Sequence, residues 1–191
     1  MRINNNINLN FQKRLVARAA VEHQGKKEDV KIFLMDEVKD KKELIKKLST
    51  KDWEKGNYTP NVVAEFRKNG NSTYVMENKK GEYIGICQTD ENIYPMVNYI
   101  ETVPKGSSFK NEREYRFVGE TFLTFLAKKA KAIGEDLAIR GVRNHKVVKD
   151  FYFKHCGFEP FRCYGAILQY DMLDDLINKN VSHTGRSVTL E

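Results

Sequence analysis

The chain has 191 residues, with 33 Lys and Arg against 26 Asp and Glu, and a formal net charge of +7. Its residues are 40% apolar and 31% charged, which is typical of one globular domain and excludes a disordered chain of high net charge. No apolar run approaches the roughly 18 residues of a membrane-spanning helix, so the sequence also excludes an integral membrane protein.

The N-terminal part of the chain predicts an arm, a β-hairpin and two helices. Residues 1–10 contain five Asn and one charge, a composition typical of a loose arm. Residues 14–22 fit a strand or a helix, and the Gln-Gly-Lys-Lys sequence at 24–27, followed by apolar residues, favours a hairpin. Apolar spacing then indicates helices at 36–48 and 61–68.

The rest of the chain alternates strands and helices, which predicts an α/β domain with a mixed sheet. The longest helical pattern covers 114–133 and ends at Gly134, a residue common after helix C-termini. Beyond residue 177 the sequence is polar, and we expect a frayed tail there. Strands are expected at 73–77, 83–88, 96–103, 137–142 and 164–172, with a further helix at 146–155.

The cysteines indicate the cellular compartment of the protein, and the basic charge indicates the kind of partner that it binds. Cys87, Cys156 and Cys163 cannot all pair, and no two have the C-x-x-C spacing of a metal site. We therefore expect no disulfide framework, no metal and a reducing cytoplasm. The basic surplus favours an anionic partner such as nucleic acid, anionic lipid or a phosphate-bearing cofactor, and a solvated basic surface explains it as well.

Two stretches carry the candidate chemistry. In the first, a strand ends at Pro104, a polar loop covers 105–113, and a helix begins with Gly119 in its first turn. The free N–H groups of a helix N-terminus favour a phosphate, and a missing Cβ lets the anion approach. In the second, a helical face of apolar and aromatic residues at 148–155 ends at Gly157, which also suits an ordinary core helix.

Together these stretches resemble the GNAT superfamily of acetyl-CoA-dependent N-acetyltransferases. In that family a Q/R-x-x-G-x-G/A motif grips the pyrophosphate and a later helix ends F-Y-x-K-x-G-F; Val118, Gly119 and residues 152–158 carry the match. The order of elements agrees over residues 33–172. The resemblance implies one domain with a mixed, mostly antiparallel sheet flanked by helices, and two strands splayed at the cofactor cleft.

The resemblance also implies the domain limits and the site. It places the N-acetyltransferase domain at 29–176, after an arm and first hairpin strand at 1–28 and before the polar tail at 177–191. Glu101 is the expected base and Tyr152 the expected acid that protonates the leaving thiolate. The expected acetyl-CoA-binding residues are Thr102, Val103, Arg113, Arg116, Phe117, Val118, Gly119, Glu120, Thr121 and Asn144.

The sequence departs from the family pattern at two places. Phe117 stands at the first Gly of the phosphate motif, and Glu114 stands where Arg or Gln is usual. When the family motif is aligned backward from Gly157, Phe153 takes the position of the acid. When it is aligned forward from Asn144, Tyr152 takes that position, and one extra residue must lie before Gly157. We prefer Tyr152, because the forward count keeps apolar residues on the buried stripe.

The expected function is acetyl transfer from acetyl-CoA to a primary amine of a small molecule or of a protein lysine. One alternative is a catalytically inactive relative that binds CoA or a protein. A nucleic-acid-binding module is a weaker alternative, since the sequence has no recognition helix or stacking aromatics.

The four histidines, at 23, 145, 155 and 183, are scattered and are expected to be surface or packing residues. The expected partner is the amine acceptor, and no membrane is expected. The sequence is also compatible with a homodimer.

Overall fold

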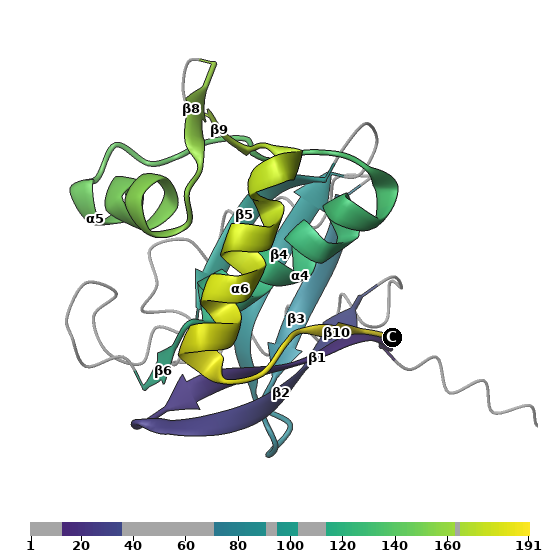
Figure 1. Cartoon of the computed structure of the whole chain (residues 1–191). Coiled ribbons are helices and arrows are strands. Elements are labelled where there is room, and N and C mark those ends of the chain that lie inside the picture. Colours follow the sequence, from purple (N-terminus) through teal and green to yellow (C-terminus); the bar gives the residue numbers. More distant parts are fainter. Residues whose placement is uncertain (1–12, 36–70, 91–94, 103–113, 163–164) are drawn as a thin grey trace, which may run out of the picture.

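The computed structural model describes residues 13–35, 71–90, 95–102, 114–162 and 165–191 (Figure 1). The helices expected at 36–48 and 61–68 lie outside these residues. The described elements are β1 (Arg14–His23), β2 (Lys26–Leu34), β3 (Asn71–Glu77), β4 (Tyr83–Asp90), β5 (Met96–Thr102), β6 (Tyr115–Arg116), α4 (Val118–Ile133), β7 (Leu137–Ile139), α5 (Lys146–Lys149), the π-helix η1 (Asp150–His155), β8 (Glu159–Phe161), β9 (Gly165–Leu168), the 3-10 helix η2 (Tyr170–Met172), α6 (Leu173–Thr184) and β10 (Thr189–Leu190).

One mixed sheet runs through the molecule in the order β10-β1-β2-β3-β4-β5-β7-β9-β8, and β6 pairs with β1. Every pairing is antiparallel except that of β5 with β7. The expected hairpin is confirmed as β1 and β2. Its two-residue turn has Gln24 at φ 49° and Gly25 at φ 77°, the positive angles that suit the twist of a tight hairpin.

β5 pairs with β7 over only the first part of its length. It pairs with β4 from Met96 to Thr102, but with β7 only at Met96 and Val97. Asn98 is an extra residue in the ladder with β4, because Val97 lies opposite Thr89 while Tyr99 lies opposite Gln88. A bulge of this kind bends its strand and increases its twist. β7 ends at Ile139, opposite Val97, so β5 continues from Asn98 to Thr102 paired with β4 and without β7.

α4 and α6 lie side by side over one face of the sheet and enclose the main core (Figure 1). Gly85 in β4 sets how closely α4 approaches. A Cβ at this position would lie 2.5 Å from a Val118 methyl carbon and 2.8 Å from the Phe122 ring. These distances are shorter than real carbon contacts, so the first turn of α4 can rest on β4 only because residue 85 is glycine.

The helix expected at 114–133 begins later, at Val118. Tyr115 and Arg116 form β6 instead, opposite His23 and Glu22 of β1. Two other expected elements are shorter or different. The strand expected at 137–142 ends at Ile139, and the helix expected at 146–155 is one turn of α5 followed by η1.

The expected frayed tail beyond residue 177 is wrong. That segment belongs to α6, whose Leu173, Leu176, Ile177 and Asn180 are buried at the spacing of one helical face. β10 then pairs with β1 at the edge of the sheet. The strand expected at 164–172 ends at Leu168, and β8 lies before it as an unexpected partner. Among the described helices, none is long and apolar enough to cross a membrane.

Candidate active site

The N-terminus of α4 presents backbone donors. Phe117 is the N-cap residue and adopts the left-handed conformation, with φ 65° and ψ 7°. The first intrahelical hydrogen bond runs from the Thr121 N–H to the Phe117 carbonyl at 2.8 Å. The amides of residues 118–120 precede that bond, and the described part of the chain supplies no acceptor for them. Such amides, together with the helix dipole, form a site for an anion.

Three elements converge beside this helix end. A Cβ on Gly119 would lie 3.5 Å from the ring of Phe151 in η1 and 3.9 Å from the side chain of Ile100 in β5. The second half of β5, the first turn of α4 and the π-helix therefore meet around Gly119. These distances are ordinary van der Waals contacts, so packing against Phe151 does not itself require glycine at position 119.

The π-helix places Tyr152 next to this junction. Its wider turn is marked by a hydrogen bond of 2.9 Å from the Cys156 N–H to the Phe151 carbonyl, five residues back. A π turn holds one more residue than an α turn, which is the extra residue that the forward count from Asn144 requires. Tyr152 packs edge-on against Phe151 and Phe158. Burial raises the pKa of the Tyr152 phenol well above its ordinary value, so the group is a neutral donor.

Glu101 lies on the other face of β5. Its neighbour Ile100 joins the core beneath α4, whereas Tyr99 packs against the second cluster of buried residues, which includes Ile86. The Tyr99 hydroxyl donates a hydrogen bond to the Glu101 carboxylate. Burial raises the pKa of Glu101, and the hydrogen bond from Tyr99 opposes that shift. A half-buried carboxyl with a raised pKa is suited to accept a proton near neutral pH.

The other expected cofactor residues are placed differently. Thr102 is half-buried at the end of β5 opposite Gly85, and Val118 is buried in the core. Arg116 is exposed, with its guanidinium 3.5 Å from the Glu22 carboxylate. Thr121 is buried, and its hydroxyl lies 3.3 Å from the Ala20 carbonyl. Asn144 is exposed in the loop before α5. Val103 and Arg113 lie outside the described residues.

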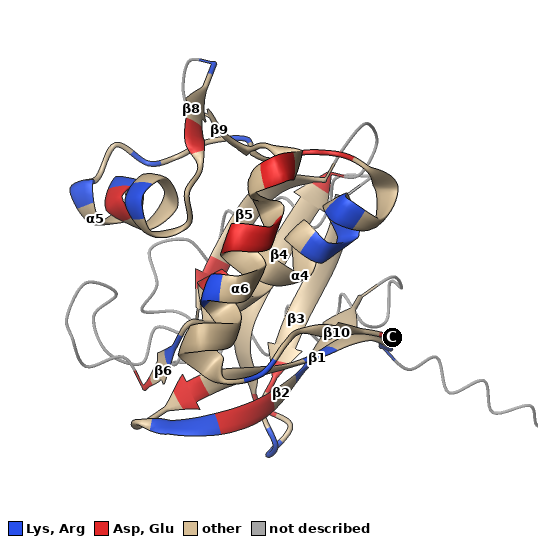
Figure 2. Cartoon of the chain, viewed as in Figure 1, with Lys and Arg blue, Asp and Glu red and all other residues tan. Residues whose placement is uncertain are grey.

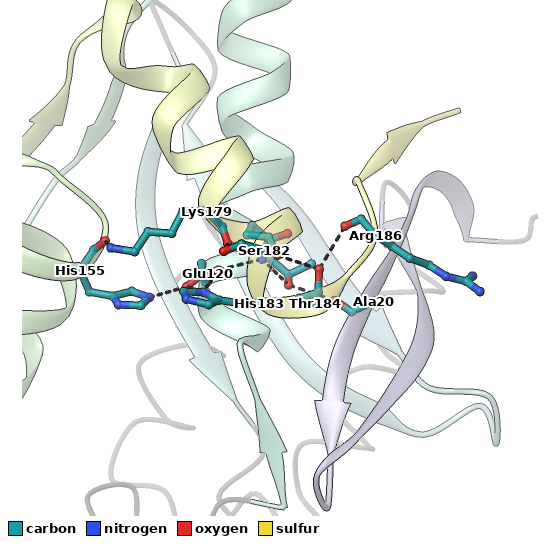
Figure 3. A network of polar contacts seen from close by, with 10 residues as sticks. Ala20, Glu120, His155, Lys179, Ser182, His183, Thr184 and Arg186 are labelled. Atoms are coloured by element: carbon teal, nitrogen blue, oxygen red, sulfur yellow. Dashed lines mark hydrogen bonds and ion pairs between the residues drawn. The ribbon is translucent and has the colours of Figure 1, made fainter.

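Glu120 has a side-chain environment that the sequence did not predict. Its carboxylate is 1% exposed and lies between His155 of η1 and His183 of α6 (Figure 3). These histidines were expected to be scattered surface or packing residues, and the structure brings both onto one carboxylate. The signal that could have revealed this was the helical apolar stripe of α6, since that helix carries His183.

Comparisons with known proteins identify the fold. No protein-family model and no curated protein matches the sequence. A chain of the KacTA–DNA complex matches with a TM-score of 0.51 over 78% of this chain and 98% of that one, at 9% identity. A chain of AtaTR bound with AcCoA matches with a TM-score of 0.50 over 77% and 97%, at 13% identity. A GNAT-family acetyltransferase from Listeria monocytogenes 4b F2365 matches with a TM-score of 0.47 over 78% and 97%, at 11% identity.

The chain has the GNAT-like fold that the sequence predicts, and it shares this fold with the KacTA and AtaTR chains. The expected fold class, one domain with a mixed and mostly antiparallel sheet flanked by helices, is confirmed. In this GNAT fold, Phe117 adopts the left-handed conformation at the position where the family motif has its first Gly.

The backbone conformation of Phe117 leads to a stability prediction. Phe117→Gly and Phe117→Ala both remove the ring that stacks on His183, so comparing them isolates the backbone. Because only glycine adopts positive φ without a steric cost, we expect the Gly variant to be more stable than the Ala variant by about 1 kcal/mol. Urea unfolding of the two variants measures the difference. An Ala variant of equal or greater stability would contradict the left-handed assignment.

The environment of Glu101 leads to a pH prediction. A raised pKa means that the folded state binds the proton more tightly than the unfolded state, so this group destabilises the fold as pH rises through the folded pKa. Glu101→Gln removes that effect. We expect the stability of the variant relative to the parent protein to increase as pH rises above about 4, the ordinary pKa of a Glu side chain, and this is measured by chemical unfolding. The control Glu135→Gln, at an exposed position, should show no such gain; a constant difference for Glu101→Gln would refute the argument.

Proposed function

We propose that this protein transfers an acetyl group from acetyl-CoA to a primary amine, carried by a small molecule or by a protein lysine. The observation that carries the proposal is the N-terminus of α4, whose first amides have no acceptor in the described part of the chain, beside the end of the β5–β7 ladder. A helix end suited to an anion therefore lies next to the part of β5 that pairs with β4 alone. Glu101 and Tyr152 lie on opposite sides of the same strand. The AtaTR chain, which shares the fold, was solved with AcCoA bound, and this supports the choice of cofactor.

The cofactor would be held mainly by backbone groups. The amides of Val118, Gly119 and Glu120 would bind the diphosphate of CoA, and the pantetheine arm would lie between β5 and β7, along Thr102 and Val103. Arg113 and Arg116 would add positive charge. The buried side chains of Thr121 and Val118 would support the helix end without touching the ligand, and Asn144 would contact the cofactor from the loop before α5.

The proposed reaction uses the two faces of β5. Glu101 accepts a proton from the incoming ammonium group, so that a neutral amine attacks the thioester carbonyl. A backbone N–H of Thr102 or Val103 stabilises the oxyanion. The new C–N bond forms, the C–S bond breaks, and Tyr152 donates its proton to the sulfur. The second proton lost by the nitrogen restores the Tyr152 hydroxyl, so the net products are the amide, CoA and one proton.

The second candidate is a GNAT-fold protein that binds CoA without turnover, and two aromatic residues at the helix end favour it. Phe117 occupies the glycine position of the motif, and the Phe151 ring covers the side of Gly119. Either ring could limit access to the site. Nucleic-acid binding is less favoured, because Lys and Arg are interspersed with Asp and Glu over the described elements in this view (Figure 2).

Binding and turnover separate the candidates. We expect saturating acetyl-CoA to raise the melting temperature, since a ligand at about 100 times its Kd stabilises a fold by about 2.7 kcal/mol. We expect free thiol to be released when suitable amines from a panel are added. Tyr152→Phe should lower kcat by about tenfold or more with KM nearly unchanged, because a proton donor acts in the transition state.

The matched control is Tyr170→Phe, at an exposed tyrosine away from the site. It should leave kcat and KM unchanged. A melting temperature that does not respond to acetyl-CoA would refute the cofactor, and binding without thiol release from any amine would support the inactive relative. Equal rates for Tyr152→Phe and the parent protein would remove Tyr152 as the acid.

A further inference from the structure

Three side chains that commonly bind metals converge from three elements. Glu120 comes from α4, His155 from η1 and His183 from α6 (Figure 3). Their ligand atoms all lie within 4.8 Å of one another. His183 Nδ1 is 3.0 Å from one carboxylate oxygen of Glu120 and 3.1 Å from the other, and His155 Nε2 contacts the second oxygen. Two imidazole nitrogens therefore point at one carboxylate.

The burial of Glu120 means that its charge carries a free-energy cost, which its neighbours must offset. The carboxylate is 1% exposed, and a buried charge is costly unless opposite charge or strong hydrogen bonds compensate it. The two imidazoles and the Asn180 amide supply hydrogen-bond partners. A divalent cation between the three side chains would supply opposite charge to the carboxylate, and each imidazole would then coordinate through the nitrogen that now faces the carboxylate.

Surrounding groups hold the three side chains in place. The Asn180 side-chain amide donates to Glu120 Oε1 at 3.0 Å, which leaves Oε2 directed toward His155. The Lys179 ammonium group donates to the backbone carbonyl of His155. The ring of Phe117 stacks on His183 with centroids 4.8 Å apart. Outer contacts of this type orient the ligands of metal sites.

We propose that this protein binds one transition-metal dication of the zinc class through Glu120, His155 Nε2 and His183 Nδ1. Two imidazoles and one carboxylate form a ligand set that favours Zn²⁺, Co²⁺ or Ni²⁺ over Mg²⁺ and Ca²⁺. The side chains of His155 and His183 are 34% and 28% exposed, so water can reach the remaining coordination position. The bound ion ties the first turn of α4 to η1 and α6. This inference does not depend on the proposed acetyl transfer.

The site needs only a small adjustment to accept an ion. Bonds of about 2.1 Å to a tetrahedral ion place two ligand atoms about 3.4 Å apart. The present separations of up to 4.8 Å exceed this by a little more than 1 Å. Rotation of the two partly exposed rings about their side-chain bonds supplies a movement of that size, while the buried carboxylate stays in place.

Cobalt spectroscopy on the metal-free full-length chain tests the proposal directly. We expect one equivalent of Co²⁺ to give an intense visible d–d band, which Zn²⁺ displaces. The band should appear without the near-ultraviolet charge-transfer absorption of a cobalt–thiolate bond, because no cysteine belongs to the site. No visible band, or a band accompanied by thiolate charge transfer, would overturn the assignment.

Variants locate the ion. His183→Gln should weaken Co²⁺ and Zn²⁺ binding by about 100-fold or more, since loss of a ligand exceeds the 10–100-fold effect of losing an outer contact. The matched control is His23→Gln. His23 also contacts carboxylates, but Glu28 lies 2.9 Å from its Nδ1 and Glu114 lies 3.3 Å from its Nε2, on two sides of the ring. The control should keep the parental affinity and stoichiometry.

Thermal unfolding provides an independent readout. Zn²⁺ should raise the melting temperature of the parent protein and of His23→Gln, and should leave that of His183→Gln unchanged. If His183→Gln does not fold, His155→Gln replaces it in both measurements, because the two rings contribute equivalent ligands. Parental affinity in the His183 and His155 variants, or loss of binding in His23→Gln, would overturn the site.

Discussion

The early end of the ladder between β5 and β7 decides where the N-terminus of α4 meets the sheet. β5 is paired with β4 from Met96 to Thr102, and the extra residue at Asn98 bends it. β7 ends at Ile139, opposite Val97, so the second half of β5 has no described strand on that side. A longer β7 would continue the ladder beside Ile100, Glu101 and Thr102.

Close packing then brings the helix to that part of the sheet. Gly85 lets Val118 and Phe122 rest directly on β4, so the first turn of α4 lies beside Ile100. The left-handed residue Phe117 turns the chain from β6 into the helix, and the residues that the structure describes offer no acceptor to the first amides of α4. The same turn buries Glu120 against α6. One short segment thus combines backbone donors for an anion with a carboxylate that requires compensation from elsewhere in the fold.

Local pattern was enough to predict much of the sheet, because strand alternation and the Gln24–Gly25 turn are encoded over a few residues. The resemblance of residues 152–158 to a family motif predicted the fold class. The start of α4 was placed too early, since pairing of Tyr115 with β1 is a long-range contact that helical periodicity does not reveal. The cluster at Glu120 could not be predicted from spacing, because His155 and His183 reach it only when α6 packs on α4. The apolar spacing of Leu173, Leu176 and Ile177 is visible in the sequence, but the polar residues beyond 177 were expected to form a frayed tail, and that expectation concealed the helix that carries His183.

The central claim is that acetyl-CoA binds at the α4 N-terminus and beside the part of β5 that pairs with β4 alone. Amide hydrogen exchange followed by mass spectrometry, with and without acetyl-CoA, measures this at the backbone itself. We expect slower exchange in residues 117–121 and 98–102 when the cofactor is present, because the first amides of α4 gain acceptors and the cofactor covers the side of β5 that no described strand pairs with beyond Val97. Unchanged exchange in both segments at a cofactor concentration that saturates binding, or protection confined to other parts of the chain, would contradict it.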